Sequence, residues 1–139
     1  MVHITDEGVY DEPLEKIWRF LNDDKGHEHS MIRTSKVLEQ SDKGMKAEVE
    51  VKGPDGSWRQ ETWSMSFNPP TGFSMEITSG PRRGTKHKHT YTPMGNKTKV
   101  VVEGEFIAQG TDDATVRKAA LAMLEQVFNE DTTHLKNFK

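Results

Sequence analysis

Apolar and polar residues alternate with a period of two through most of the stretch from Ser35 to Gln109. Successive side chains of a strand point to opposite faces of a sheet, so this alternation predicts strands with one buried face. Segments rich in Gly, Pro, Asn, Asp and Ser interrupt it and are typical of turns. They are residues 41–44, 53–56, 68–72, 81–84 and 93–96. We therefore expect six antiparallel strands joined by hairpins.

Helical patterns flank this region. After a β-like opening at 2–10, Pro13 precedes apolar residues at one-face helical spacing, which predicts a short amphipathic helix. Residues 23–34 are predicted as a second short helical turn or a loop. Thr111 or Asp112 can cap a long final helix that reaches nearly to Lys139. Its apolar positions recur at three and four residue steps: Val116, Ala120, Met123, Leu124, Val127, Phe128, Leu135 and Phe138.

This order of elements predicts an α+β fold, in which a long helix covers one face of an antiparallel sheet of about seven strands. At 139 residues, the chain fits one domain spanning 1–139. Four local motifs accompany this order. They are Pro-x-x-x-Ile-Trp-x-Phe-Leu-x-Asp at 13–23, Asn-Pro-Pro-x-Gly-Phe at 68–73, Tyr-Thr-Pro-x-Gly at 91–95 and Asp-x-x-x-Leu-Lys at 131–136.

These motifs resemble the SRPBCC superfamily, the helix-grip group of START, Bet v 1 and polyketide cyclase/dehydrase-like proteins. The resemblance covers essentially the whole chain, and its motifs specify a fold better than a reaction. It implies a curved sheet that grips the long C-terminal helix, with two short helices after the first strand. It also implies a cavity for hydrophobic or amphipathic molecules between the sheet and that helix.

The segment GTKHKHTYTP at 84–93 fixes the register of the sheet. Pairing Lys86 with Glu105 and Lys88 with Glu103 sets opposite charges across the strands and places Glu76 beside Lys88, so the lysines face water. A slip by one residue would exchange the two faces. We therefore expect His87 and His89 to point inward.

The same register predicts the rows of the inner face. One row reads Ala47, Trp63, Ile77, His87, Gly104, and the next reads Met45, Met65, Met75, His89, Val102. A third reads Val49, Glu61, Ser79, Thr85, Phe106, with Arg59 beyond it and Tyr91 beside Phe73 and Val100. The missing side chain of Gly104 leaves room for His87. Arg82, Arg83 and nearby lysines are expected to form a solvated basic edge.

This inner face is too polar to be only a packed core, because a buried polar group without a partner costs about 1–3 kcal/mol. Its polar side chains either satisfy one another and ordered water or line a ligand cavity. In the second case, the ligand-binding residues are Arg59, Trp63, Met45, Met65, Met75, Ile77, Val102, Phe106, Met123 and Val127. The methionines suit either an irregular core or an adaptable pocket wall.

An enzyme would use Glu61 and a histidine as general base and acid, with His87, His89 and Tyr91 as the remaining candidate catalytic residues. The resemblance permits such chemistry, since some superfamily members cyclise or dehydrate polyketides. A metal site built on His87 and His89, with Glu61 or with His27 and His29, is a weaker alternative. We expect no metal and no cofactor, and the sequence assigns no role to His27 and His29.

Composition limits the remaining classes. The chain is 32% hydrophobic and 29% charged with a net charge of −3, which disfavours a nucleic-acid binder. Without cysteine it has no disulfide or thiolate chemistry. It lacks a signal-peptide pattern and a long apolar run, so we expect a cytoplasmic protein without stable membrane insertion. The sequence does not determine the oligomeric state.

Three hypotheses about function follow. We favour binding of a hydrophobic or aromatic small molecule, lipid or polyketide-like, in the cavity between sheet and C-terminal helix. The second hypothesis is a polyketide cyclase or dehydratase-like enzyme with the acid–base residues named above. The third is an interaction module like the chaperone activators of the same superfamily.

Overall fold

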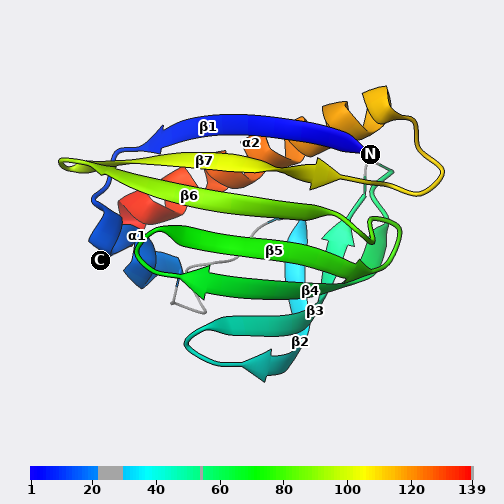
Figure 1. Ribbon diagram of the computed structural model, residues 1–139, viewed down its shortest axis with the longest axis horizontal. Coiled ribbons are helices and arrows are strands. Elements are labelled where there is room, and N and C mark those ends of the chain that lie inside the picture. Colours follow the sequence, from blue (N-terminus) through cyan, green and yellow to red (C-terminus); the bar gives the residue numbers. More distant parts are fainter. Residues whose placement is uncertain (22–29, 54, 139) are drawn as a thin grey trace.

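The computed structural model describes residues 1–21, 30–53 and 55–138 and has an α+β architecture (Figure 1). A strand, β1 (Val2–Tyr10), and a helix, α1 (Leu14–Leu21), come first. Six strands follow, and α2 (Asp113–Asn137) ends the order of elements. The six strands are β2 (Ile32–Gln40), β3 (Gly44–Lys52), β4 (Trp58–Asn68), β5 (Gly72–Ser79), β6 (Lys86–Met94) and β7 (Lys97–Phe106).

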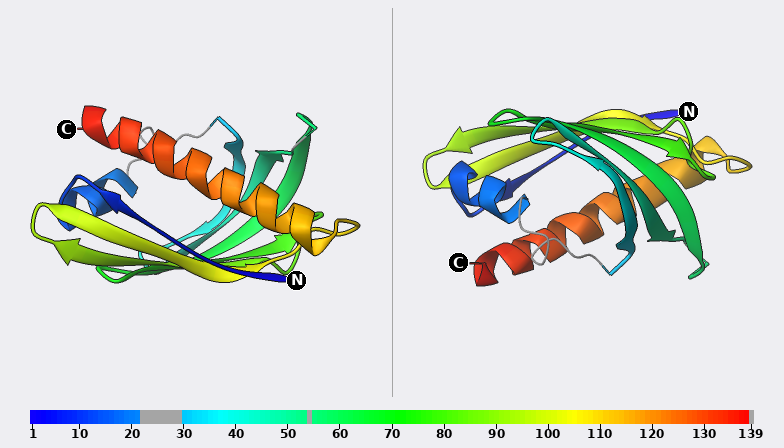
Figure 2. Two further views of the ribbon diagram at one scale, coloured as in Figure 1. Left: turned by 90° about the horizontal axis from the view of Figure 1, so that it is seen from above. Right: turned by 90° about the horizontal axis from the view of Figure 1, so that it is seen from below.

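The strands form one antiparallel sheet in the order β1-β7-β6-β5-β4-β3-β2. The sheet curves, and α2 runs across its concave side (Figure 2). The predicted α+β helix-grip fold is therefore confirmed. A second short helical turn or a loop was expected at 23–34. Residues 23–29 lie outside the described residues. Residues 32–34 belong to β2, so the prediction is wrong for these three positions.

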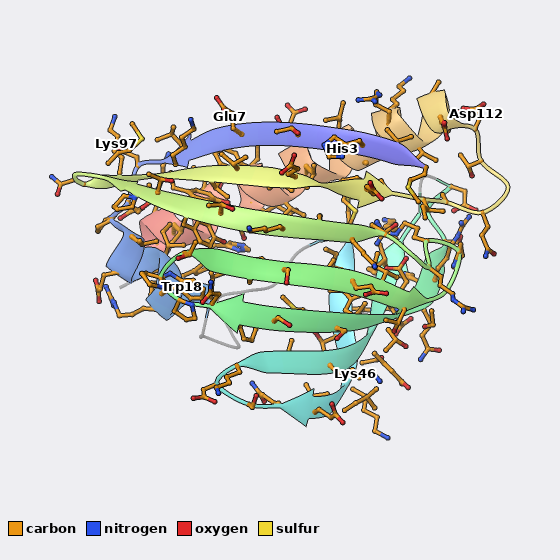
Figure 3. All side chains as sticks on the ribbon, in the orientation of Figure 1. His3, Glu7, Trp18, Lys46, Lys97 and Asp112 are labelled. Carbon is orange, nitrogen blue, oxygen red and sulfur yellow. The ribbon has the colours of Figure 1, made fainter. Side chains whose placement is uncertain are left out.

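Helix α2 begins as the sequence predicts. Asp112 is the N-cap, and its carboxylate accepts a hydrogen bond of 2.7 Å from the Thr115 backbone N–H (Figure 3). Such a cap satisfies one of the four free N–H groups at the start of a helix. Val116 near this end and Leu135 near the other are buried. The helix is thus anchored to the rest of the protein near both ends.

Most buried apolar residues of the described chain form three separate clusters. One contains Leu135 and Tyr91 near α1, and a second contains Val116 and Phe106 near the start of α2. The third lies on β3, from Ala47 to Val51. The middle of α2 contacts the edges of these clusters through partly buried side chains such as Leu124, Phe128 and Met123.

The predicted orientation of β6 is confirmed. Lys86 pairs with Glu105 and Lys88 with Glu103, and both lysines are exposed. His87 pairs with Gly104, as expected, and both histidines lie on the covered face. A Cβ at residue 104 would overlap the Lys86 carbonyl oxygen and the His87 backbone. Glycine is required here by this close approach of the two strands.

The predicted rows shift by two residues between β5 and β6. Met75 pairs with His87, for which the sequence predicted Ile77. Phe73 pairs with His89, for which the sequence predicted Met75. Glu76 consequently faces Lys86 instead of Lys88, with 4.0 Å between its carboxylate and Nζ. A second irregularity places Ser79 opposite Thr62 instead of Glu61. Both changes of register lie near the connection between β5 and β6, at residues 79–85.

Candidate functional site

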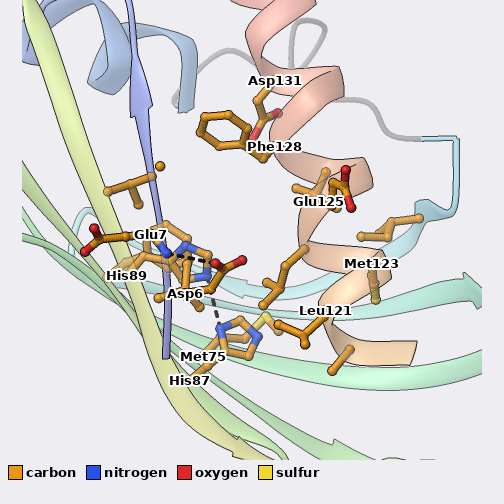
Figure 4. A pocket seen from close by; sticks show the side chains of 18 of the residues that line it. Asp6, Glu7, Met75, His87, His89, Leu121, Met123, Glu125, Phe128 and Asp131 are labelled. Atoms are coloured by element: carbon orange, nitrogen blue, oxygen red, sulfur yellow. Dashed lines mark hydrogen bonds between the residues drawn. The ribbon is translucent and has the colours of Figure 1, made fainter. Parts of the chain in front are cut away.

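A cavity of about 510 Å³ lies between the sheet and α2. Side chains of β1, β4, β5, β6 and β7 and of α1 contribute to its walls, and α2 closes the opposite side. Asp131, Glu125 and Leu121 come from α2, whereas His87, His89 and Met75 come from the sheet (Figure 4). The cavity occupies the space that the separate core clusters leave under the middle of the helix.

Most residues that the sequence assigns to the site line this cavity. Among the candidate ligand-binding residues these are Trp63, Met65, Met75, Val102, Phe106, Met123 and Val127. Among the candidate catalytic residues they are His87, His89 and Tyr91. Four others, Glu61, Arg59, Met45 and Ile77, do not line it.

Glu61 is held in an ion pair rather than presented to the cavity. Its side chain is 2% exposed, and both of its carboxylate oxygens accept bonds of 2.7 Å from the Arg82 guanidinium. The indole N–H of Trp63 donates a third bond, of 2.9 Å. Bidentate charge-assisted bonds of this kind fix geometry as well as charge. Glu61 therefore does not line the cavity as the sequence predicted, and its role as a general base stays a prediction.

Arg59, Met45 and Ile77 also differ from expectation. The Arg59 side chain is 45% exposed and lies 3.5 Å from Asp55 in an ion pair, because it sits at the end of β4 next to a surface turn. Met45 packs against the cluster on β3, and Ile77 is completely buried in the sheet. These three side chains contact other parts of the protein and do not line the cavity.

The two histidines of β6 form a hydrogen-bonded pair on the floor of the cavity. His89 Nε2 lies 3.0 Å from His87 Nδ1. Each imidazole also stacks on a phenylalanine, His87 on Phe106 with centroids 5.5 Å apart and His89 on Phe73 at 4.4 Å. Burial, reinforced by the nearby Arg82 charge, lowers the pKa of His87 to about 4. His87 is therefore neutral at neutral pH and presents an uncharged imidazole.

A second polar group lies at the α1 end of the cavity, around Asp131. This carboxyl is 8% exposed, and burial raises its pKa to about 7. The charge of Glu130 contributes to this raised pKa, while a hydrogen bond from the Tyr10 hydroxyl acts in the opposite direction. Burial also raises the pKa of Tyr10 and of Tyr91 well above the ordinary tyrosine value. Both tyrosines are thus neutral donors near a carboxyl that titrates close to neutrality.

Aromatic rings surround this carboxyl. Tyr10 stacks on Phe128 with centroids 4.7 Å apart, and both residues line the cavity with Asp131. Tyr91 makes an edge contact with Trp18 at 5.8 Å. Gly8 allows the approach, since a Cβ there would lie 2.7 Å from the Phe128 ring. The α1 end of the cavity is therefore an aromatic enclosure with one buried carboxyl.

Sequence reasoning missed Arg82, Asp131, Tyr10 and Asp6 as lining residues. A signal existed for Asp131, which lies between Val127 and Leu135 at four-residue steps on the apolar stripe of α2. Asp6 and Tyr10 share the inner face of β1 with Ile4 and Gly8. Arg82 had no such signal, because its partner Glu61 is 21 positions away.

The candidate metal ligands His27 and His29 lie outside the described residues. Within the ranges that the structure describes, no group of three or more His, Cys, Asp or Glu side chains is arranged to hold a metal ion. In those same ranges, neither helix is both long and apolar enough to cross a membrane.

Comparison with known proteins assigns the family. Residues 1–137 match the family model described as polyketide cyclase / dehydrase and lipid transport. The chain belongs to this SRPBCC-type family, as the motifs in its sequence indicated. No curated protein matches the chain significantly.

Solved structures agree on the fold. A START superfamily protein from Mycobacterium smegmatis is similar at 12% identity over 99% of both chains, with a TM-score of 0.82. TTHA0849 from Thermus thermophilus is similar at 12% identity over 98% of both chains, with a TM-score of 0.83. The ZhuI aromatase/cyclase from Streptomyces sp. R1128 is similar at 14% identity over 96% of this chain and 90% of its own, with a TM-score of 0.68. At these identities the likeness establishes the fold alone.

Proposed function

We propose that this protein binds a hydrophobic or aromatic small molecule, lipid or polyketide-like, in the cavity between the sheet and α2. The observation that carries the proposal is the cavity itself. Its volume of about 510 Å³ falls within the range of roughly 300–1,000 Å³ that is usual for small-molecule sites. Its walls combine apolar side chains with a few convergent polar groups, as ligand sites do.

The chemistry of the walls supports an adaptable, largely apolar guest. Met65, Met75 and Met123 line the cavity from the sheet and the helix. Thioether side chains are polarisable and change rotamer at little cost, so they fit guests of several shapes. Phe106 and Trp63 add flat aromatic surface to the lining. The family, which includes lipid transport by its description, is consistent with such a guest.

Filling the cavity tests the proposal. Val127 is partly buried and lines the cavity from α2, so Val127→Trp is expected to occupy the space that a guest would take. Ala122→Trp is the matched control, since it places the same side chain at an exposed position of the same helix. Both variants are titrated with N-phenylnaphthylamine, a neutral apolar dye whose fluorescence rises in apolar surroundings.

Wild type and Ala122→Trp are expected to bind the dye, and Val127→Trp to lose at least about tenfold in affinity, because the side chain and the dye compete for one space. Circular dichroism checks that both variants are folded. Equal dye binding by Val127→Trp and the control would overturn the proposal, because the dye would then bind elsewhere.

A second candidate function is acid–base catalysis on a bound polyketide-like molecule. The observation that favours it is the neutral imidazole of His87, which faces the cavity and is hydrogen-bonded to His89. A neutral imidazole can accept a proton from a bound guest. Of the other candidate catalytic residues, Tyr91 can donate a hydrogen bond to a guest, whereas the Glu61 carboxylate is paired with Arg82.

The test is turnover of a polyketone thioester mimic. Loss of turnover in His87→Gln with unchanged dye binding would support catalysis. Turnover by wild type no faster than in buffer would remove this candidate. For the third hypothesis, an interaction module, no feature of the described residues provides an argument, and it stays a hypothesis.

A further inference from the structure

The charged groups that line the cavity are unequally distributed. The carboxylates of Asp6 on β1 and Glu125 on α2 line it, together with the buried Asp131. Glu7 also borders the cavity, but its carboxylate lies 3.5 Å from Lys99 Nζ on the outer face of β1. Arg82 is the one lining residue among the described ranges that carries a permanent positive charge. Its guanidinium is held by both oxygens of Glu61 at 2.7 Å, so its charge is already balanced. Among the described lining residues, a carboxylate guest would therefore meet the carboxylates of Asp6 and Glu125 and no cation that is not already paired.

The lysines of β6 do not change this balance. Lys86 and Lys88 belong to β6, which forms the cavity floor, but they occupy the opposite face and are exposed. Desolvating a carboxylate without a cationic partner is costly, whereas a cation that meets a buried carboxylate recovers much of its desolvation penalty. The cavity therefore disfavours anionic amphiphiles such as fatty acids.

The α1 end of the cavity has the features that bind organic cations. Asp131 is buried there, and the rings of Tyr10, Tyr91 and Phe128 line the same cavity. Aromatic faces attract ammonium groups through their quadrupole, and more strongly in desolvated surroundings. A carboxylate among such rings supplies the charge-assisted hydrogen bond that a protonated amine needs.

We infer that the cavity selects guests with a protonated amine on an aromatic or aliphatic body, the ammonium group binding at Asp131 among the rings of Tyr10, Tyr91 and Phe128. This inference rests on the proposed function and names the class of its ligand. The apolar part of the guest extends along the methionine and phenylalanine walls toward His87, and the amine end determines the orientation.

A matched series of ligands tests the charge preference. Decylamine, decanol and decanoate share one alkyl chain and differ in the charge of the head group. Each displaces N-phenylnaphthylamine from wild type, from Asp131→Asn and from Asp113→Asn. Asp113→Asn is the control, because it makes the same chemical change at an exposed position of α2 away from the cavity.

Decylamine is expected to displace the dye from wild type at a concentration about tenfold or more below that of decanol, with decanoate weakest. Asp131→Asn is expected to remove the advantage of the amine, measured within that variant as the ratio of the displacing concentrations of decanol and decylamine. Asp113→Asn is expected to behave like wild type.

Stronger displacement by decanoate than by decylamine, or an unchanged amine advantage in Asp131→Asn, would overturn the inference and leave the proposed function intact. Failure of wild type to bind the dye and all three ligands would instead overturn the proposed function, and this inference with it.

Discussion

Two ionisable groups of the cavity have opposite effects on how stability depends on pH. The pKa of His87 falls from 6.5 to about 4 on folding, because burial and the charge of Arg82 disfavour the imidazolium. Between these values the unfolded chain binds a proton that the folded protein does not, so stability is lost as pH falls through this window. The pKa of Asp131 rises from 3.8 to about 7, mainly through burial. Here the folded protein holds the proton longer, so stability is lost as pH rises.

The size of each effect follows from the pKa shift. One unit corresponds to about 1.4 kcal/mol, so His87 contributes a change of about 3 kcal/mol and Asp131 one of about 4 kcal/mol over their windows. The two slopes oppose each other between about pH 4 and 6.5 and nearly cancel in wild type. Replacing either residue is expected to expose the slope of the other.

The perturbations are His87→Gln and Asp131→Asn, which keep polarity but do not titrate. Urea unfolding of each variant and of wild type is followed from about pH 4 to 8, and the difference from wild type is plotted against pH. A loss of packing changes the free energy of unfolding by the same amount at every pH, so it does not alter the slope of this difference. Among the described residues, Tyr10, Tyr91 and Glu130 interact with Asp131, while Arg82 lowers the pKa of His87 and His89 is hydrogen-bonded to it.

Relative to wild type, Asp131→Asn is expected to gain stability as pH rises from about 4 to 7, and His87→Gln as pH falls from about 6.5 to 4. The two differences must therefore change in opposite directions. Curves parallel to wild type for either variant would refute the reasoning, because that group would then titrate alike in the folded and unfolded states.

Three further predictions concern stability. Glu61→Gln leaves the Arg82 guanidinium without its carboxylate and is expected to cost about 3 kcal/mol in urea unfolding, with Glu61→Leu/Arg82→Met recovering most of it. Equal instability of the double variant would contradict the ion-pair argument. Gly104→Ala forces a Cβ into the backbone of β6 and is expected to lower the free energy of unfolding by about 1–3 kcal/mol. An unchanged Tm would contradict this, because β6 and β7 would then accommodate the Cβ without loss of stability. Asp112→Ala removes the N-cap of α2 at a cost of about 1 kcal/mol, while Asp113→Asn should stay within about 0.5 kcal/mol of wild type.

The sequence predicted the fold and the faces of the sheet well, because both follow from periodicity. The β5–β6 pairing is displaced by two residues from the predicted one, since the connection at 80–85 does not close as a tight hairpin. A displacement by an even number keeps every side chain on its face. His87 and His89 therefore point inward as predicted, although their neighbours on β5 differ from the expected ones.

The composition of the site was harder to predict, because ion pairs between distant segments have no periodic signature. Arg82 belongs to a loop that the sequence suggested was a solvated edge, yet its guanidinium reaches Glu61 on β4. That contact removes Glu61 from the set of available carboxyls. Asp131 takes its place as the buried carboxyl of the cavity, and only its position on the apolar stripe of α2 indicated this.

The position of the cavity explains why binding and stability should be coupled in this protein. Helix α2 is anchored by Val116 and Leu135, and apolar side chains between them, such as Leu124 and Phe128, pack at the edges of the core clusters and also line the cavity. Apolar walls in contact with water contribute little to folding, because their transfer from water is incomplete. A guest that covers the partly exposed Met65, Met123 and Val127 completes this transfer and binds the folded state alone. Its binding must therefore raise the stability of the protein with increasing guest concentration, as mass action requires.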